Sequence, residues 1–387
     1  MFISNDIKYI GVNDHQIDFF EGQFEVPLGM AYNSYVILDE KIAVIDTVDR
    51  NFTAELLSNL NEVLQGRAVD YLIIQHMEPD HSSSIAEFMQ AYPETKIVAS
   101  DKAFKMMVNF YGFNDVSKQI VAKEGDVLSL GKHTLNFIAA PMVHWPEVIM
   151  TYDGYDKVLF SADAFGKFGA NDMEDPEGWA CEARRYYFGI VGKYGPQVQT
   201  LLKKAAPLEI KTICSLHGPV LSENIAYYID IYDTWSKYAV ESEGIVIAYT
   251  SVYGNTEKAA KLLADTLKQN GCKKVVLIDL IREDLYESIE DAFRYGTLVL
   301  ASTTYNNDLF PKMKQFIEHL VERNYQKRTV AFIENGSWAP AAMKVMKNML
   351  SNAKEIRFAE NNVTVLSSAT EQNKAELQAL AKELLAK

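Results

Sequence analysis

The chain has 387 residues, of which 48% are hydrophobic and 23% charged, a composition typical of a globular protein with enough apolar residues for two domains. Its 52 acidic and 38 basic side chains give a net charge of −14, which argues against nucleic acid or an anionic membrane surface as a partner. The three cysteines form no CxxC pair, no apolar run is long enough to span a membrane, and the N-terminus has no export pattern, so we expect a cytoplasmic protein.

The first part of the chain shows short strand patterns with helical patterns between them. Two β-rich runs at residues 35–38 and 42–45 surround a polar pair, which predicts a hairpin. Residues 52–64 have helical periodicity, and Ser84 to Glu87 is a capping-box pattern that predicts the start of a helix. Further strand-like runs occupy residues 71–74, 135–139, 158–160 and 212–215.

The second part begins after a polar stretch that ends in Gly244, and it has a regular rhythm. Strands are predicted at 245–249, 275–278, 298–301, 330–333 and 363–366, and helices at 257–269, 285–294, 312–323, 341–350 and 371–385. Five strands with intervening helices predict a doubly wound parallel sheet. We therefore expect one domain at residues 1–243 and a second at 244–387.

Seven candidate metal ligands follow directly on the strand-like runs of the first part. They are His76, Glu78, Asp80, His81, His144, Asp163 and His217. Strand ends at one edge of a sheet can converge on a single site. The set offers nitrogen and oxygen donors without a thiolate, which suits iron, manganese or zinc. Seven ligands are too many for one tetrahedral ion, and they suit two ions that share a bridge.

The competing interpretation of any single histidine is a hydrogen-bonded core or surface residue, and we assign no role to His15, His133 and His319. The dense run from His76 to His81 differs, because packing alone does not place so many ionisable groups beside a core.

A second constellation predicts a flavin site in the second domain. The loop 251–256 joins its first strand to a helix, where backbone N–H groups and hydroxyls form a phosphate site. The loop lacks the pattern of nucleotide triphosphatases and resembles the flavodoxin phosphate loop, which binds FMN. Loops after the third and fourth strands lie where this fold binds nucleotides, and their aromatic rings can stack on a flavin. The candidates are Ser251, Tyr253, Gly254, Asn255, Thr256, Thr303, Thr304, Tyr305, Asn306, Asn307, Asn335, Gly336, Ser337 and Trp338.

The competing interpretations are a simple strand-to-helix turn for the loop 251–256 and ordinary packing for Trp338.

The metal run resembles the metallo-β-lactamase signature H-x-H-x-D-H, with Glu78 at the second histidine position. This glutamate form, joined to a flavodoxin-like half, resembles the flavodiiron proteins (A-type flavoproteins) over essentially the whole chain. Gly29 and the run 32–35 also resemble that family's N-terminal pattern, and we expect them to be structural. The resemblance implies an α/β fold, with an N-terminal metallo-β-lactamase-like αββα sandwich and a C-terminal flavodoxin-like doubly wound parallel sheet.

The resemblance also implies FMN and two non-haem iron ions as cofactors. It implies that one iron is bound by His76, Glu78 and His144, that the other is bound by Asp80, His81 and His217, and that Asp163 bridges them. All seven family ligand positions are filled.

The activity implied by the resemblance is reduction of dioxygen to water, of nitric oxide to nitrous oxide, or of both. Electrons would pass from an external donor, commonly rubredoxin in this family, through FMN to the irons. The assembly would be a head-to-tail homodimer or a dimer of dimers, with Glu78 and Trp145 as candidates to line the contact. Because the chain has no CxxC, we expect no fused rubredoxin domain.

Two alternatives stay open at the level of sequence. One is a zinc-dependent hydrolase of the metallo-β-lactamase fold with an accessory flavodoxin domain. The other is an electron carrier whose first domain holds no metal. The sequence does not separate dioxygen from nitric oxide, because no residue outside the metal ligands can be tied to selectivity.

Overall fold

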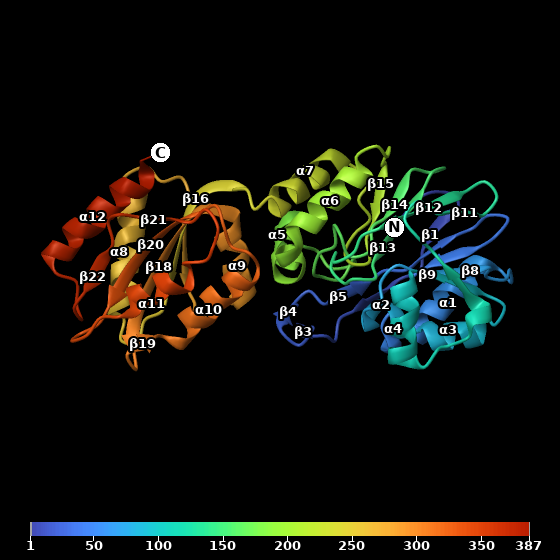
Figure 1. Cartoon of the computed structure of the whole chain (residues 1–387), viewed down its shortest axis with the longest axis horizontal. Helices are drawn as coiled ribbons and strands as arrows, with labels where there is room; N and C mark the ends of the chain where they lie inside the picture. The colour runs from blue at the N-terminus through green and yellow to red at the C-terminus, as the bar shows by residue number, and fades with distance from the viewer. Residues whose placement is uncertain (1, 387) are drawn as a thin grey trace. The chain divides into compact units, whose positions relative to one another are not determined.

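The computed structural model of the chain describes residues 2–386 and divides into two compact units, Met1–Asp233 and Thr234–Lys387 (Figure 1). The expected boundary after residue 243 lies inside the second unit. Trp235 Nε1 donates to Glu241 Oε2 at 2.6 Å, and the Glu241 N–H donates to the carbonyl of Arg294 at 3.0 Å. Residues 234–243 therefore belong to the second unit by their contacts.

The first unit contains two sheets that face each other. The first sheet has the order β1-β6-β7-β8-β9-β10 and the second has the order β11-β12-β13-β14-β15. The first consists of β1 (Ile7–Tyr9), β6 (Tyr35–Ile37), β7 (Ala43–Ile45), β8 (Tyr71–Ile74), β9 (Lys96–Ala99) and β10 (Gln119–Val121). The second consists of β11 (Val127–Ser129), β12 (Thr134–Ala139), β13 (Ile149–Asp153), β14 (Val158–Phe160) and β15 (Thr212–Cys214).

The core of this unit lies between the two sheets. Ile37 and Ile73 from the first sheet pack in one cluster with Phe137, Ile149 and Phe160 from the second, and all of them are buried. Apolar side chains on the two inner faces are what hold such a sandwich together, because their burial removes a large apolar area from water. The antiparallel pairing of β6 with β7 confirms the predicted hairpin.

Helices cover the outer faces of the sandwich and complete the predicted αββα arrangement. In Figure 1 α1, α3 and α4 lie beside β8 and β9, and α5, α6 and α7 lie beside β13, β14 and β15. The helices of this unit are α1 (Thr53–Leu64), α2 (Pro79–Ser82), α3 (Ile85–Ala91), α4 (Asp101–Tyr111), α5 (Trp179–Tyr186), α6 (Gly195–Ala205) and α7 (Ile225–Ser236), which extends into the second unit.

The helix predicted to start at Ser84 is confirmed, since α3 begins at Ile85, but the expected capping bond is absent. The Ser84 side chain does not cap α3. Its Oγ donates to the carbonyl of Val48 at 2.8 Å and pairs with Thr53 Oγ1 at 2.7 Å, so it joins two segments instead. The N-terminal residues also form small sheets that the sequence did not reveal. They are β2 (Val12–Asp14) with β5 (Met30–Tyr32), and β3 (Phe19–Phe20) with β4 (Phe24–Glu25).

The second unit is built on one mainly parallel sheet with the order β17-β16-β18-β20-β21, in which β22 also pairs with β20. Only β19 runs antiparallel to its neighbour among the described strands of this sheet. The strands are β16 (Ser242–Tyr249), β17 (Val275–Asp279), β18 (Tyr295–Tyr305), β19 (Asp308–Leu309), β20 (Thr329–Asn335), β21 (Arg357–Phe358) and β22 (Val363–Val365). The predicted doubly wound parallel sheet is confirmed.

Helices cover both faces of this sheet, as Figure 1 shows. Apolar side chains of α8 and α12, among them Leu263 and Leu380, pack in one cluster with Ile247, Val299 and Ile333 from one face of the sheet. Alternate strand residues face the other helices, because successive side chains of a strand point to opposite faces. The helices are α8 (Asn255–Gln269), α9 (Leu285–Arg294), α10 (Pro311–Glu322), α11 (Ala342–Met349) and α12 (Glu371–Leu385).

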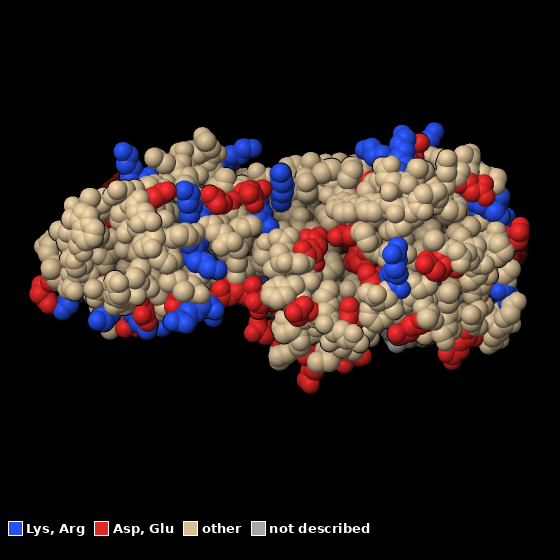
Figure 2. Space-filling model, turned by 90° about the horizontal axis from the view of Figure 1, so that it is seen from below, with Lys and Arg blue, Asp and Glu red and all other residues tan. Residues whose placement is uncertain are grey.

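The surface carries the excess of acidic groups expected from the net charge of −14. On the face shown in Figure 2, basic side chains are interspersed among acidic ones. Among residues 2–386, no helix is both long and apolar enough to cross a membrane.

Candidate metal centre and flavin site

The seven predicted metal ligands lie in segments that follow strands of the two facing sheets. They are His76 after β8, Glu78 before α2, Asp80 and His81 in α2, His144 after β12, Asp163 after β14 and His217 after β15. All seven side chains are buried. The structure brings them together in two adjoining groups.

The first group consists of His76, Glu78, His144 and one oxygen of Asp163. The Nε2 atoms of His76 and His144 are 3.3 Å apart. Glu78 Oε2 lies 3.2 Å from the first of these nitrogens and 2.9 Å from the second. Asp163 Oδ2 lies 3.3 Å and 3.0 Å from the same two atoms. Four potential ligand atoms thus surround one point.

The second group consists of Asp80, His81, His217 and the other oxygen of Asp163. The Nε2 atoms of His81 and His217 are 3.0 Å apart. Asp80 Oδ2 lies 3.2 Å from His81 Nε2 and 3.3 Å from His217 Nε2. Asp163 Oδ1 lies 3.3 Å from His81 Nε2 and 3.9 Å from His217 Nε2. The two oxygens of one carboxylate therefore face different groups.

These donor atoms fit a pair of metal ions. With bonds of about 2.1 Å, neighbouring nitrogen and oxygen ligands of one ion lie roughly 3.0 to 3.4 Å apart. The distances given above run from 2.9 to 3.3 Å, apart from the 3.9 Å between Asp163 Oδ1 and His217 Nε2. Both carboxylate oxygens of Asp80 and of Asp163 are buried without a hydrogen bond to any described residue. Buried carboxylates are rarely left in this state, because desolvation of a charge is costly unless a cation compensates it.

The electrostatics of the site favour positive charge between the carboxylates. Burial acts to lower the pKa of His144, but the carboxylates of Asp163 and Glu78 outweigh burial and raise this pKa to about 9. Burial acts to raise the pKa of Asp163, but the surrounding histidines hold it well below its usual range. Either protonated imidazoles or metal cations can supply this positive charge. The two compete, because a histidine must lose its proton before it can bind a metal.

Acceptors behind the rings orient two of the histidines. His76 Nδ1 lies 2.8 Å from Glu147 Oε1, which also accepts the N–H of Met77 at 2.9 Å. His217 Nδ1 lies 2.8 Å from the carbonyl of Ala31. A proton held on Nδ1 by such an acceptor leaves the lone pair of Nε2 free for a metal. Sequence reasoning missed Glu147 and Ala31, because neither belongs to a motif.

Aromatic rings form the wall around the two groups. The Trp145 ring lies 5.2 Å from that of His76, edge to face. The rings of Phe20 and Tyr186 each lie 5.5 Å from that of His217. These rings limit the access of bulk water to the polar centre.

The flavin candidates of the second unit surround a cavity of about 710 Å³ at the C-terminal ends of the parallel strands. Every candidate except Gly254 lines it. The cavity also involves Val252, Ala339 and Ser367, which the sequence analysis missed. Ser367 follows the C-terminal end of β22. It could have been found by the argument used for the other loops, which is that nucleotides bind at the C-terminal ends of parallel strands. Its Oγ lies 2.6 Å from that of Ser337, and its N–H donates to Asn335 Oδ1 at 3.1 Å.

The phosphate loop has the features that a bound phosphate requires. Gly254 has a φ of +82° and precedes α8, so the N-terminal N–H groups of this helix lie at the loop. The buried Oγ of Ser251 has no hydrogen-bond partner among the described residues, which suits an unfilled donor to a phosphate. The rings of Tyr253 and Trp338 are 91% and 88% exposed at the cavity, where a flavin can cover them.

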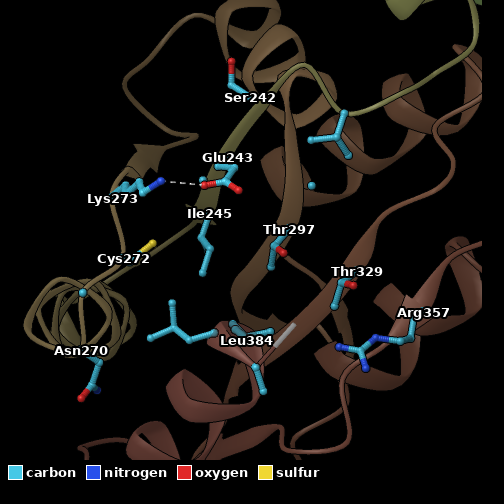
Figure 3. A pocket seen from close by; sticks show the side chains of 16 residues that line it. Ser242, Glu243, Ile245, Asn270, Cys272, Lys273, Thr297, Thr329, Arg357 and Leu384 are labelled. Carbon is cyan, nitrogen blue, oxygen red and sulfur yellow. Dashed lines mark hydrogen bonds and ion pairs between the residues drawn. The ribbon is translucent and has the colours of Figure 1, made fainter.

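A second cavity of about 690 Å³ lies at the opposite end of the same sheet, where the strands begin. Figure 3 shows Ile245 and Leu384 beside this space, with the Glu243–Lys273 ion pair at one side. None of the described residues that line this cavity begins a helix; the C-terminal ends of α8 and α12 lie there instead. Doubly wound sheets bind nucleotides at the C-terminal strand ends, so the cavity of 710 Å³ is the flavin candidate.

Comparison with known proteins places both units in recognised families. Residues 30–218 match the family model of the ODP family beta lactamase, and residues 246–374 match a flavodoxin domain. The chain is 32% identical to a nitric oxide reductase of Moorella thermoacetica, over 94% of this chain and 92% of that protein. It is 36% identical to putative diflavin flavoprotein A 2 of Synechocystis, over 71% of this chain but only 48% of that protein.

Solved structures agree along the whole chain. The rubredoxin oxygen:oxidoreductase of Desulfovibrio gigas is 26% identical, with a TM-score of 0.91 over 99% of this chain and 97% of that one. The flavodiiron protein of Giardia intestinalis is also 26% identical, with a TM-score of 0.92 over 99% of this chain and 96% of that one. The β-lactamase-type unit, the flavodoxin unit and the similarity to the nitric oxide reductase along most of both chains show that the chain belongs to the flavodiiron protein family of oxidoreductases.

Proposed function

We propose that this chain reduces dioxygen to water, nitric oxide to nitrous oxide, or both, with electrons supplied by an external donor. The observation that carries the proposal is the Asp163 carboxylate, whose two oxygens face two separate groups of buried ligands. The flavin-type cavity in the same chain supplies the second element that such a reaction needs.

The ligand residues divide into two sets in this proposal. His76, Glu78 and His144 would hold one iron, and Asp80, His81 and His217 would hold the other, with one oxygen of Asp163 facing each group. When bound, FMN would supply electrons in pairs or singly, and the irons would supply the redox chemistry that reduction of a diatomic gas requires. Dioxygen needs four electrons and four protons to form two waters, and two nitric oxides need two of each to form nitrous oxide and water.

The chain's own residues prepare the site for this chemistry. Glu147 and the Ala31 carbonyl hold His76 and His217 with their Nε2 atoms toward the centre. The rings of Trp145 and Phe20 pack against His76 and His217, and the ligand side chains are buried, so charges there interact more strongly than they would in water.

Zinc hydrolysis is the competing activity of this sandwich fold. Zinc binds more tightly than ferrous iron to a given set of nitrogen and oxygen ligands, so affinity alone does not exclude it. The flavodoxin unit and the relatives named for nitric oxide and oxygen reduction favour the redox activity. Glu78 stands where the zinc hydrolases have histidine, and it supports the same choice.

The decisive experiment combines composition with turnover. Protein purified under native conditions is analysed for metal and flavin and then supplied, without air, with a chemical reductant and either dioxygen or nitric oxide. We expect about two irons and one FMN per chain and consumption of at least one gas. Active protein with zinc at both positions, or iron-loaded protein that consumes neither gas, would overturn the proposal.

The partners follow from the redox activity. An external donor must reduce the FMN, and we propose a rubredoxin, because one structural relative is a rubredoxin oxygen:oxidoreductase. We also propose a head-to-tail homodimer, alone or paired as a dimer of dimers, in which the FMN of one chain serves the metal centre of the other.

A further inference from the structure

The loop that carries His217 is held from one side by a single short segment, Ala31–Tyr35, which ends β5 and begins β6. The backbone N–H of Asn33 donates to the carbonyl of Leu216 at 2.8 Å. The carbonyl of Ala31 accepts from His217 Nδ1 at 2.8 Å. This segment therefore contacts both the ligand ring and the backbone beside it.

The side chain of Asn33 adds two further contacts across the same loop. Its Nδ2 donates to the carbonyl of Ser215 at 2.9 Å and to the carbonyl of Gly218 at 2.8 Å. These two carbonyls flank His217 in the sequence, so one amide group spans the loop. The Oδ1 atom accepts from Asn171 Nδ2 at 2.9 Å, which fixes the orientation of the amide. Asn33 is fully buried, so water does not replace these bonds.

A third side chain holds the same loop. The hydroxyl of Tyr35, which is also fully buried, donates to the Ser215 carbonyl at 2.6 Å. Ser34 of this segment reaches the first ligand group only indirectly: its Oγ donates to the carbonyl of Asp46, and Asp46 Oδ1 accepts the N–H of His76 at 3.3 Å. The ring of His76 is oriented by Glu147 instead. Among the described ligand-bearing segments, the side chains of Asn33 and Tyr35 thus hydrogen-bond only to the loop that carries His217.

We propose that Asn33 is a positioning residue that sets the affinity of the metal position formed by Asp80, His81 and His217, and that it leaves the position formed by His76, Glu78 and His144 largely unaffected. The inference rests on the proposed metal role of these residues and goes beyond it, because it assigns a selective task to a residue that binds no metal. Residues that orient a histidine ligand typically change metal affinity by about 10- to 100-fold when they are removed.

The test is a titration of the metal-free full chain with cobalt(II), in competition with a chelator and monitored by visible absorption. Cobalt(II) is the probe because it reports each bound ion without turnover. We expect the parent to bind two ions per chain. In Asn33→Ala we expect one ion to bind as in the parent and the other at least tenfold more weakly. His217→Ala gives the reference pattern for loss of the second position.

Three further variants distinguish a specific effect of Asn33 on the His217 loop from a general loss of stability. Asn33→Asp keeps the shape of the side chain but removes both donors, so it should weaken the second ion at least as much. Tyr35→Phe removes one hydroxyl and should have a smaller effect in the same direction, even if both Asn33 variants fold poorly. Asn136→Ala is the matched control, because this amide lies in β12 and its bonds go to the carbonyls of Thr134 and Tyr152.

The cobalt(II) affinities of these variants either support or overturn the role of Asn33. Selective weakening of one ion in the Asn33 variants or in Tyr35→Phe, with parental binding in Asn136→Ala, supports it. Parental affinity for both ions, or equal weakening of both, would overturn it. Because cobalt(II) binding is measured without dioxygen or nitric oxide, this result is independent of the proposed activity.

Discussion

Asp163 is the residue on which both ligand groups depend. Its Oδ2 lies 3.0 Å from His144 Nε2, and its Oδ1 lies 3.3 Å from His81 Nε2. An amide in this place has one acceptor oxygen and no charge, so it can serve only one ion. We expect Asp163→Asn to lower the affinity for both irons by at least tenfold, because the surviving contact also loses its charge.

Iron content after dialysis against a graded chelator measures this effect. Asp172→Asn, an exposed carboxylate paired with His15, should keep the parental iron content. Loss of one iron with normal retention of the other would show that Asp163 is a terminal ligand.

His133 illustrates a histidine with a structural task. It is buried, with Nδ1 3.1 Å from Asp153 Oδ2 and Nε2 3.4 Å from Asp6 Oδ2. Burial acts to lower the pKa of His133, but these carboxylates outweigh burial and raise it. A raised pKa means that the folded state binds the proton more tightly, so the stabilisation is complete below about pH 6 and is lost as pH rises through the folded pKa.

We therefore expect His133→Gln to destabilise the first unit by roughly 1 kcal/mol below about pH 6 and by less as the pH rises. Hydrogen exchange of peptides from β12 and β13, compared with the parent at each pH, measures the difference. His319→Gln, followed through peptides of α10, is the control, because burial and Arg323 lower the pKa of His319, so its effect should have the opposite dependence on pH. A difference independent of pH would mean that His133 stays neutral.

Elements were predictable from sequence where they are long and periodic. Five strands of the second unit have apolar runs and alternate with helices, so their succession along the chain followed from the pattern. The two-residue strands β19 and β21 of the same unit were not predicted. The strands β2, β3 and β4 have two or three residues each, too few to show a period. β2 pairs with β5 and β3 pairs with β4, and strands this short depend on such pairing rather than on a pattern of their own.

The residues of the metal site also differ in how far the sequence revealed them. Ligand types and their positions after strands were visible in the sequence, because each group of ligands follows an apolar run. The supporting residues were not: Glu147 and Ala31 contact the histidines through folding of segments far apart in the chain. At Ser84 a local pattern was misleading. It predicted a side-chain cap on the helix, but the Ser84 hydroxyl bonds with Val48 and Thr53 instead.

Arg328 binds the segment that precedes the first strand of the second unit, β16. The guanidinium is buried, and Nη1 donates to the carbonyl of Tyr238 at 2.7 Å while Nη2 donates to that of Ala239 at 3.1 Å and to that of Phe293. Replacement with an apolar side chain leaves these carbonyls without their charged donor. We expect Arg328→Met to reduce the free energy of unfolding of this unit by roughly 3 kcal/mol.

Urea unfolding followed by flavin fluorescence gives this value. Arg328→Lys should also be destabilising, because one ammonium cannot replace a planar fork of donors. Lys312→Met, a change at an exposed position of α10, should shift the free energy by less than about 0.5 kcal/mol. An Arg328→Met protein as stable as the parent would show that these carbonyls find water instead.

At the scale of the whole molecule, the metal ligands and the flavin cavity belong to different units of the chain. The proposed head-to-tail dimer makes electron transfer between chains the working route. Two inactive variants test it. His76→Ala with His144→Ala keeps the flavin site and destroys one metal position. Gly254→Val keeps the metal ligands and should lose FMN, because a β-branched residue is strained at a φ of +82° and would distort the loop before α8.

A heterodimer of these two variants, isolated through a different tag on each chain, contains one intact cross-chain pair of flavin and metal centre and no intact pair within a chain. If electrons cross between chains, it should recover about half of the parental activity per dimer, since one of two symmetric pairs is restored. Each variant alone should stay inactive, and flavin and iron analysis of the heterodimer must show one complete set of each. An inactive heterodimer with both cofactors in place would contradict the cross-chain route, and a parent chain that stays monomeric at working concentration would contradict the dimer itself.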